Sequence, residues 1–252
     1  MNQLNVNLPE LPYAVSEAMN RLRINIKFCG KNTRKTSCQP NEGKSTISSY
    51  LWKMLAEAGF PTVLVDVDLR KSVMKTRFQM DYDDDTTMGL NHYLSGMAEY
   101  EDVVYSTNIP NGYMVPCTQL LENPSALLED IRFKELLNTL SENYRFVIID
   151  SPPLGSVADG ALIASLCDGA VLVVRAGTTP RTLIKQSLYE IQQSGCKLLG
   201  TVLNRADVKG RAYGKYGYGK YGYGYGYGYG YEPKDKKNSS DSASTDKNSS
   251  GN

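Results

Sequence analysis

This sequence has lysine, hydroxyl and carboxylate side chains suited to phosphate chemistry beside segments that are expected to form a helix and strands. Gly43-Lys44-Ser45 comes directly before a stretch with helical periodicity. In a phosphate-binding loop, backbone N–H groups at a helix N-terminus surround phosphate oxygens, a lysine reaches the outer phosphates and a hydroxyl binds Mg²⁺. The full pattern, G-x-x-x-x-G-K-[S/T], asks for glycine where this chain has Cys38. The segment alone therefore leaves a chance Gly-Lys-Ser at a helix start open.

Three carboxylates follow two apolar runs. Asp66 and Asp68 end "TVLVDVD", and Asp150 ends "RFVIID". Ligands of open α/β sheets bind beyond the carboxyl ends of the strands, and a carboxylate there can hold Mg²⁺ through water. The Asp-x-Asp pair also fits a simple turn with Arg70 as its ion-pair partner. Together with Gly43-Lys44-Ser45, the three acids predict a nucleotide–Mg²⁺ site.

The elements that must position these residues alternate along the chain. Near-continuous apolar runs predict strands buried on both faces, at 62–68, 145–150, 169–177 and 197–204. Apolar residues at helical spacing predict helices, at 45–59, 123–144 and 182–195. Gly59 stands where a C-terminal helix cap is expected. Strands alternating with helices predict an α/β fold like that of P-loop NTPases, a mostly parallel sheet with helices on both faces.

Composition narrows the class of protein. The 252 residues carry 28 Lys+Arg and 27 Asp+Glu, so global charge gives no attraction to nucleic acid or anionic lipid. The five cysteines form no C-x-x-C pair, which favours reduced thiols. No apolar run has the roughly 18 residues of a membrane span, and the first residues do not resemble a signal peptide. We expect a soluble cytoplasmic protein that reaches the membrane only through a partner.

The C-terminal third contains a tyrosine–glycine block. Nine of the 18 tyrosines occur here, at Tyr213, Tyr216, Tyr218, Tyr221, Tyr223, Tyr225, Tyr227, Tyr229 and Tyr231. Glycine between tyrosines keeps a chain flexible and forms no core. The block is a substrate, an adhesive segment or a nucleic-acid-binding tail, and its four basic residues make the last reading weak. We predict a domain over 1–208, this tail over 209–231 and a disordered polar segment over 232–252.

Several of these segments together resemble one family. They are "TSCQPNEGKST", "VLVDVDLRK", "ENPSALLED" and "FVIIDSPP". Over residues 10–208 the chain is similar to the bacterial tyrosine kinases of capsule and exopolysaccharide synthesis, Gram-positive cytoplasmic type, and the tail matches their C-terminal tyrosine cluster. The resemblance implies an ATP-dependent protein-tyrosine autokinase whose own tail tyrosines are the phosphoacceptors.

The resemblance also implies a role for each matching residue. The nucleotide and its Mg²⁺ would be held by Glu42, Gly43, Lys44, Ser45, Thr46, Asp68, Asp150 and Asn204. Lys44 would neutralise phosphate charge, Ser45 would ligate Mg²⁺ with Asp68 and Asp150 ordering its shell, and Thr46 would hold the α-phosphate. Asp66 would accept the tyrosine proton, although the sequence leaves Asp66 and Asp68 interchangeable in that role. Asn204 would contact adenine or simply end a strand.

Partners follow from the same resemblance. The family works with a transmembrane activator, a polysaccharide co-polymerase, and a cognate tyrosine phosphatase, and it assembles into rings through an N-terminal E-x-x-R-x-x-R helix. Here that motif reads Glu17, Asn20 and Arg23, so one expected arginine is missing. No nucleic-acid partner is implied.

A second departure precedes the phosphate-binding loop. The strand expected there is apolar in such folds, but this chain has "KNTRKTSC", as if apolar residues were lost between Lys35 and Thr36. A polar central strand would bury Arg34 or Lys35 unpaired, at a cost. Two alternatives therefore stay open: a partition- or septum-type ATPase of the same fold, and a catalytically impaired scaffold with an adhesive tail.

Three other features predict ordinary structural roles. His92, the single histidine, is expected on the surface or at a helix cap, and Trp52 is expected to be partly buried. The acidic run 81–85 is expected to be a solvated loop, because no rigid element fixes a metal geometry there.

Overall fold

The computed structural model describes residues 3–27, 42–83, 86–154 and 159–206. The chain divides into one unit of residues 1–207 and another of residues 208–252. The polar segment before the phosphate-binding loop and the tyrosine–glycine tail both lie outside the described residues, so the expectations for them stay predictions.

The larger sheet has five strands in the order β1-β3-β4-β2-β5. Their bounds are Gln3–Leu4 for β1, Tyr105–Thr107 for β3, Gly112–Val115 for β4, Thr62–Asp66 for β2 and Phe146–Asp150 for β5. All neighbours run parallel except β3 and β4. The predicted mostly parallel sheet is confirmed. Strands β2 and β5 pair with Asp66 opposite Asp150, which brings both carboxylates to one edge.

A second sheet holds two parallel strands, β6 (Gly169–Arg175) and β7 (Lys197–Asn204). Strand β6 is buried along nearly its whole length, whereas β7 is mostly exposed. Within the described residues no strand ladder joins β5 to β6, so the strands sort into two sheets. An apolar cavity of about 30 Å³ touches both, lined on the strand side by Ile148, Val171 and Val173.

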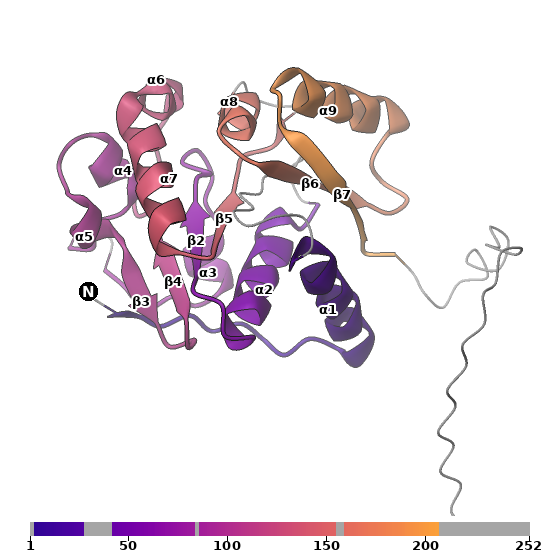
Figure 1. Cartoon of the computed structure of the whole chain (residues 1–252), viewed down its shortest axis with the longest axis horizontal. Helices are drawn as coiled ribbons and strands as arrows, with labels where there is room; N and C mark the ends of the chain where they lie inside the picture. Colours follow the sequence, from indigo (N-terminus) through magenta and orange to yellow (C-terminus); the bar gives the residue numbers. More distant parts are fainter. Residues whose placement is uncertain (1–2, 28–41, 84–85, 155–158, 207–252) are drawn as a thin grey trace, which may run out of the picture. The chain divides into compact units, whose positions relative to one another are not determined.

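Helices cover both faces of these sheets (Figure 1). The longer ones are α1 (Tyr13–Lys27), α2 (Lys44–Glu57), α7 (Ile131–Asn143), α8 (Asp159–Ser165) and α9 (Arg181–Gln193). Short helices connect them: α3 (Met74–Arg77), α4 (Leu90–Leu94), α5 (Tyr100–Val103) and α6 (Ser125–Glu129). None of the described helices is long and apolar enough to cross a membrane.

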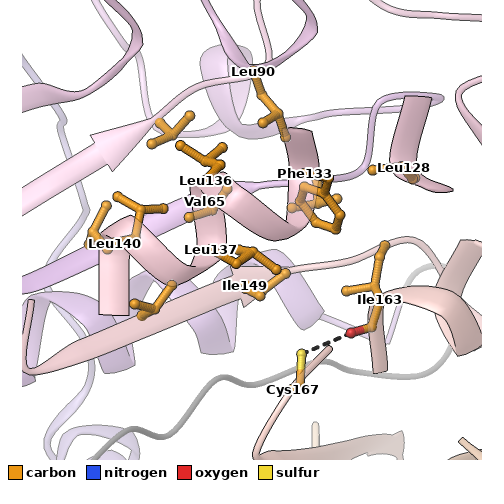
Figure 2. Packing of buried hydrophobic residues seen from close by; sticks show 14 of the residues in the cluster. Val65, Leu90, Leu128, Phe133, Leu136, Leu137, Leu140, Ile149, Ile163 and Cys167 are labelled. Carbon is orange, nitrogen blue, oxygen red and sulfur yellow. Dashed lines mark hydrogen bonds between the residues drawn. The ribbon is translucent and has the colours of Figure 1, made fainter. Parts of the chain in front are cut away.

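Two cores result, because successive strand residues point to opposite faces. Val63 and Val65 of β2 join one cluster with α7, α8 and α9, while Leu64 joins the other with α1 and α2. Figure 2 shows the first cluster, in which α7 packs Phe133, Leu136, Leu137 and Leu140 against the sheet, and the Cys167 thiol donates to the Ile163 carbonyl at 3.0 Å. Strands β2, β5 and β6 are thus covered on both sides, as their unbroken apolar sequences predicted. The same prediction is wrong for 197–204, because β7 has only one strand neighbour and is mostly exposed.

Two further predictions, of the helix at 123–144 and of the burial of Trp52, are wrong in detail. The helix expected over 123–144 is two helices, because Asp130 takes an extended conformation with ψ 149° and caps α7, its carboxylate accepting the Arg132 N–H at 2.9 Å. Asparagine and aspartate favour caps over helix interiors. Trp52 is fully buried rather than partly buried, since its indole N–H donates to the Thr62 carbonyl at 3.1 Å and satisfies its polar atom.

Candidate functional site

The turn before α2 depends on a glycine. Gly43 has φ +91°, a conformation that side chains rarely adopt, and a Cβ there would meet the Asn204 amide nitrogen at 2.3 Å. The absent side chain therefore serves both the turn and the close approach of β7. Helix α2 then begins at Lys44, so the N–H groups of its first turn lie at the end of a helix of 14 residues, where anions are favoured.

Asp150 lies under this helix start. Its Oδ1 accepts the Ser48 hydroxyl at 3.0 Å, and Ser45 also donates to it. Burial raises the pKa of Asp150 to about 6, although hydrogen bonds from Ser45 and Ser48 and the charge of Lys44 oppose that rise. Sequence reasoning missed Ser48, which stands one helical turn after Ser45 and could have been found from that spacing.

Asp66 is the most deeply placed of the three acids. Burial, then the charge of Asp150, raises the pKa of Asp66 well above its ordinary value, and a hydrogen bond from the Ser72 hydroxyl partly offsets this. Asp68 is half-buried, and its Oδ1 accepts the Lys71 N–H at 3.1 Å. Burial raises the pKa of Asp68 as well, with the Lys71 N–H and the Lys44 charge opposing it. The structure therefore brings together the acids that the sequence singled out.

This group of acids suits Mg²⁺ bound with a nucleotide. The charges of Asp150 and Asp68 raise the pKa of Asp66, and the charge of Asp68 raises the pKa of Asp150. A cation among these carboxylates would relieve that repulsion. In the described part of the chain no cluster of three or more His, Cys, Asp or Glu side chains is arranged to hold a metal by itself. Mg²⁺ typically takes one or two carboxylates, a hydroxyl, water and substrate phosphates, which matches Ser45 beside Asp150.

Arg70 fastens the Asp66–Asp68 loop to two other elements. Its Nε donates to Asp159 Oδ2 at 2.7 Å, and its Nη1 donates to the Glu122 carbonyl at 2.6 Å. Ser125 donates to the same carboxylate at 2.5 Å. Arg70 therefore forms an ion pair, but with Asp159 and not with the Asp66–Asp68 pair that the sequence suggested. Asp159 was not found from the sequence, because the contact spans 89 residues.

Thr46 has one described partner from outside its helix. Arg77 of α3 places Nη1 at 3.4 Å from the Thr46 hydroxyl. The contact is long, and it brings a cation beside the residue that the resemblance assigns to the α-phosphate.

Glu42, which precedes α2, is hydrogen-bonded to residues at the ends of β6 and β7. The Asn204 amide donates to the Glu42 carbonyl at 2.7 Å, and the Thr179 hydroxyl donates to Glu42 Oε1 at 2.5 Å. Asn204 thus anchors the loop; contact with adenine stays a prediction. No sequence signal pointed to Thr179, which follows β6 and meets Glu42 from 137 residues away.

Other predicted residues fall as follows. His92 acts at a helix start, where its Nδ1 accepts the Gly89 N–H at 3.0 Å, so the cap reading is confirmed. Glu17, Asn20 and Arg23 lie on α1, with Met19 buried between them. The acidic run continues into residues 84–85, which lie outside the described part.

Comparison with known proteins now decides the family. The model of the AAA domain family matches residues 41–192. Tyrosine-protein kinase CpsD of Streptococcus agalactiae is 42% identical over 208 residues, which is 81% of this chain and 90% of the relative. The chain belongs to the bacterial tyrosine-protein kinases. It is a member of a nucleotide-binding family, and Lys44 and Ser45 lie at the start of α2. Binding of the phosphates at this helix start stays a prediction.

Solved structures agree with this family. The crystal structure of the chimerical protein CapA2B2 has a TM-score of 0.71 and 32% identity, covering 80% of this chain and 92% of that one. The septum site-determining protein MinD of Pyrococcus horikoshii has a TM-score of 0.57 and 22% identity, covering 70% of this chain and 72% of that one. The second likeness shows the fold alone, so the partition-type ATPase is the more distant reading.

Proposed function

We propose that this chain is an ATP-dependent protein-tyrosine kinase that phosphorylates the tyrosine cluster 213–231 of its own kind. The observation that carries the proposal is the register of β2 and β5, which sets Asp66 beside Asp150. Asp150 in turn lies beside the Lys44–Ser45 helix start. Nine tyrosines on the same chain supply acceptors for the phosphoryl group.

Each residue of the site has a part in that transfer. Lys44 offsets charge on the outer phosphates, and the first-turn N–H groups of α2 orient them. Ser45, Asp68 and Asp150 would hold Mg²⁺, which supplies charge neutralisation on the phosphates when bound. Thr46 would contact the α-phosphate, with Arg77 beside it.

The transfer itself moves one proton and one phosphoryl group. A tail tyrosine oxygen forms the new bond to phosphorus, and ADP leaves with the electrons of the broken bond. The phenolic proton passes to a carboxylate, because free tyrosine has a pKa near 10 and is protonated at neutral pH. We assign that acceptor to Asp66. Asp68, which is the more exposed of the pair, is the second candidate.

We assign the regulatory setting from the same resemblance. The kinase controls capsule or exopolysaccharide synthesis and export from the inner face of the membrane, recruited by a separate transmembrane activator and reset by a tyrosine phosphatase. Copies meet through the α1 helix that carries Glu17 and Arg23, in ring-like assemblies that Asn20 weakens.

Phosphorylation would also change how copies associate. Each phosphotyrosine adds about −1.5 to −2 charge, so nine would make a weakly basic tail strongly acidic. Repulsion between such tails opposes assembly, and we expect light scattering to show a lower particle mass after phosphorylation. Equal mass before and after would remove this part of the proposal.

The experiment is direct. Purified protein is incubated with ATP and Mg²⁺, with and without an activator fragment, and phosphotyrosine is measured. The matched control replaces all nine tail tyrosines with phenylalanine. Labelling of the native chain and none of the control is expected. No labelling under any condition would favour the scaffold alternative, and labelling of the control would mean that the acceptors lie elsewhere.

A further inference from the structure

The carboxylate of Glu42 has one oxygen without a partner. Glu42 is 3% exposed, and its Oε2 is buried with no hydrogen-bond partner. The other two such atoms in the described residues are hydroxyl oxygens, of Ser49 and Ser187, so Glu42 is the one ionisable group among them. A buried acceptor left unpaired is costly, and more so when it is charged.

Two neighbours hold Glu42, one at its carboxylate and one at its main chain. The Thr179 hydroxyl donates to Glu42 Oε1 at 2.5 Å, which is its shorter contact, since the Arg175 carbonyl lies at 3.2 Å. The Asn204 amide donates to the Glu42 main-chain carbonyl at 2.7 Å. Thr179 therefore holds the carboxylate by Oε1, and Asn204 holds the main chain from which it extends.

No cation in the described part of the chain neutralises this oxygen through an ion pair. The ion pairs that join Lys53 to Glu57 and Arg70 to Asp159 do not involve it. A fixed acceptor without a cation suits a hydrogen-bond donor that arrives with a ligand.

The position of Glu42 indicates which ligand brings that donor. The residue directly precedes the Gly43-Lys44 turn, and its partners Thr179 and Asn204 lie at the carboxyl ends of β6 and β7. Ligands of such sheets bind at the carboxyl ends. With the phosphates at the start of α2, the nucleoside is the part of the nucleotide left to lie near β6 and β7.

We propose that Glu42 is a specificity-determining residue whose Oε2 accepts a hydrogen bond from the nucleoside, given by the exocyclic amine of adenine or by a ribose hydroxyl. The inference rests on the proposed nucleotide site. A carboxylate only accepts, so the subsite favours a donor and rejects a carbonyl oxygen in the same place.

The test compares nucleotides that differ in one donor. The affinity of the full chain is measured by calorimetry for ADP, 2′-deoxy-ADP, 3′-deoxy-ADP and IDP, in which a carbonyl replaces the exocyclic amine. We expect the native chain to bind one of the three analogues at least about tenfold more weakly than ADP, because hydrogen bonds to charged groups are worth at least that much. Which analogue is weak identifies the donor.

Two variants sharpen the result. Glu42→Gln keeps an acceptor for Thr179 and presents an amide N–H where Oε2 was, so it should abolish the discrimination and, if the amine is the donor, favour IDP. The matched control is Glu57→Gln at the other end of α2, which removes an exposed carboxylate and should leave the preference unchanged.

Each outcome has a separate meaning. Equal native affinity for all four nucleotides would overturn the inference without any variant, and so would unchanged discrimination in Glu42→Gln. Both results leave nucleotide binding intact. No binding of any nucleotide to the native chain would overturn the proposed function instead.

Discussion

The two sheets contribute unequally to the site. The five-stranded sheet supplies Asp66 and Asp150 from strands buried along their whole length, and serines donate to both carboxylates. The two-stranded sheet supplies Asn204 from the largely exposed β7, and Asn204 holds the main chain of Glu42, whose buried carboxylate keeps one oxygen unpaired. The difference separates an acidic side, to which we assign the phosphoryl chemistry, from a side to which we assign recognition of the nucleoside.

Helix α2 and the loop before it connect the two sides. Beside them lies the cavity of about 30 Å³. Its lining comes from both sheets and from helices α1 and α2: Leu22, Lys44, Ile47, Ser48, Leu51, Ile148, Ile149, Asp150, Val171 and Val173. A small apolar void costs contacts that a filled core would make. The side chains that line this cavity therefore make fewer contacts than they would in a filled core.

The largest expected effect comes from a substitution of Lys44 on the acidic side of the site. Lys44→Met removes the charge on the phosphates while keeping a similar volume, so we expect phosphotyrosine formation to fall at least about 100-fold with little loss of stability. The measurement is the rate of tail labelling beside the thermal midpoint. Lys53→Met, on the same helix but half-buried and paired with Glu57 away from the acids, is the control. A Lys44→Met chain that still labels its own tail would refute the assignment.

An insertion tests the prediction that apolar residues are missing before the phosphate-binding loop. Two to four Val or Ile residues between Lys35 and Thr36 should raise stability by about 3 kcal/mol, since each buried branched side chain contributes about 1.5–3 kcal/mol before strain. Nucleotide affinity should rise with it. Thermal melts and calorimetry are the readouts, and an insertion of the same number of serines is the control. If neither quantity rises, the polar segment is already accommodated.

The recognition side depends on Gly43. Gly43→Ala should cost about 1–2 kcal/mol of backbone strain and also push away Asn204, lowering nucleotide affinity about tenfold. Gly59→Ala is a close control, because Gly59 has φ +85° but a Cβ there would meet nothing within 4 Å. Equal loss of affinity in both variants would show that Asn204 does not matter to the loop.

The last prediction concerns Asp159, whose ion pair with Arg70 holds the Asp66–Asp68 loop. Burial raises the pKa of Asp159, but hydrogen bonds from Arg70 and Ser125 outweigh it and leave the pKa below its ordinary value. Asp159→Asn should cost about 1–3 kcal/mol at neutral pH. A lowered pKa gives stability above the unfolded value, near 3.9, that is lost as pH falls.

The difference between the native chain and Asp159→Asn in the free energy of unfolding should therefore shrink below about pH 4. Chemical denaturation at several pH values measures it. Asp130→Asn, which keeps a good helix cap, should show no such trend. A difference that is constant with pH would contradict the charge-based role.

The sequence predicted an element of the fold where that element had a hydrophobic pattern of its own. Strands β2, β5, β6 and β7 were predicted because each is a continuous apolar run, and strand ends then located Asp66 and Asp150. Strands β1, β3 and β4 were missed because they are two to four residues long and lack that pattern. Thr179 and Asp159 were missed because their contacts join distant parts of the chain, which no local pattern encodes.

The pairing of β1 sets an order of events during synthesis. Gln3 and Leu4 pair with Ser106 and Thr107, and Val6 hydrogen-bonds both ways with Asn108, 102 residues later. A ribosome adding roughly 5–20 residues per second needs roughly 5–20 s to make that stretch. Through that interval the apolar side chains of Leu4, Val6 and Leu8 have no sheet edge to join. The nascent chain therefore exposes a short apolar segment, to which chaperones and neighbouring nascent chains compete to bind.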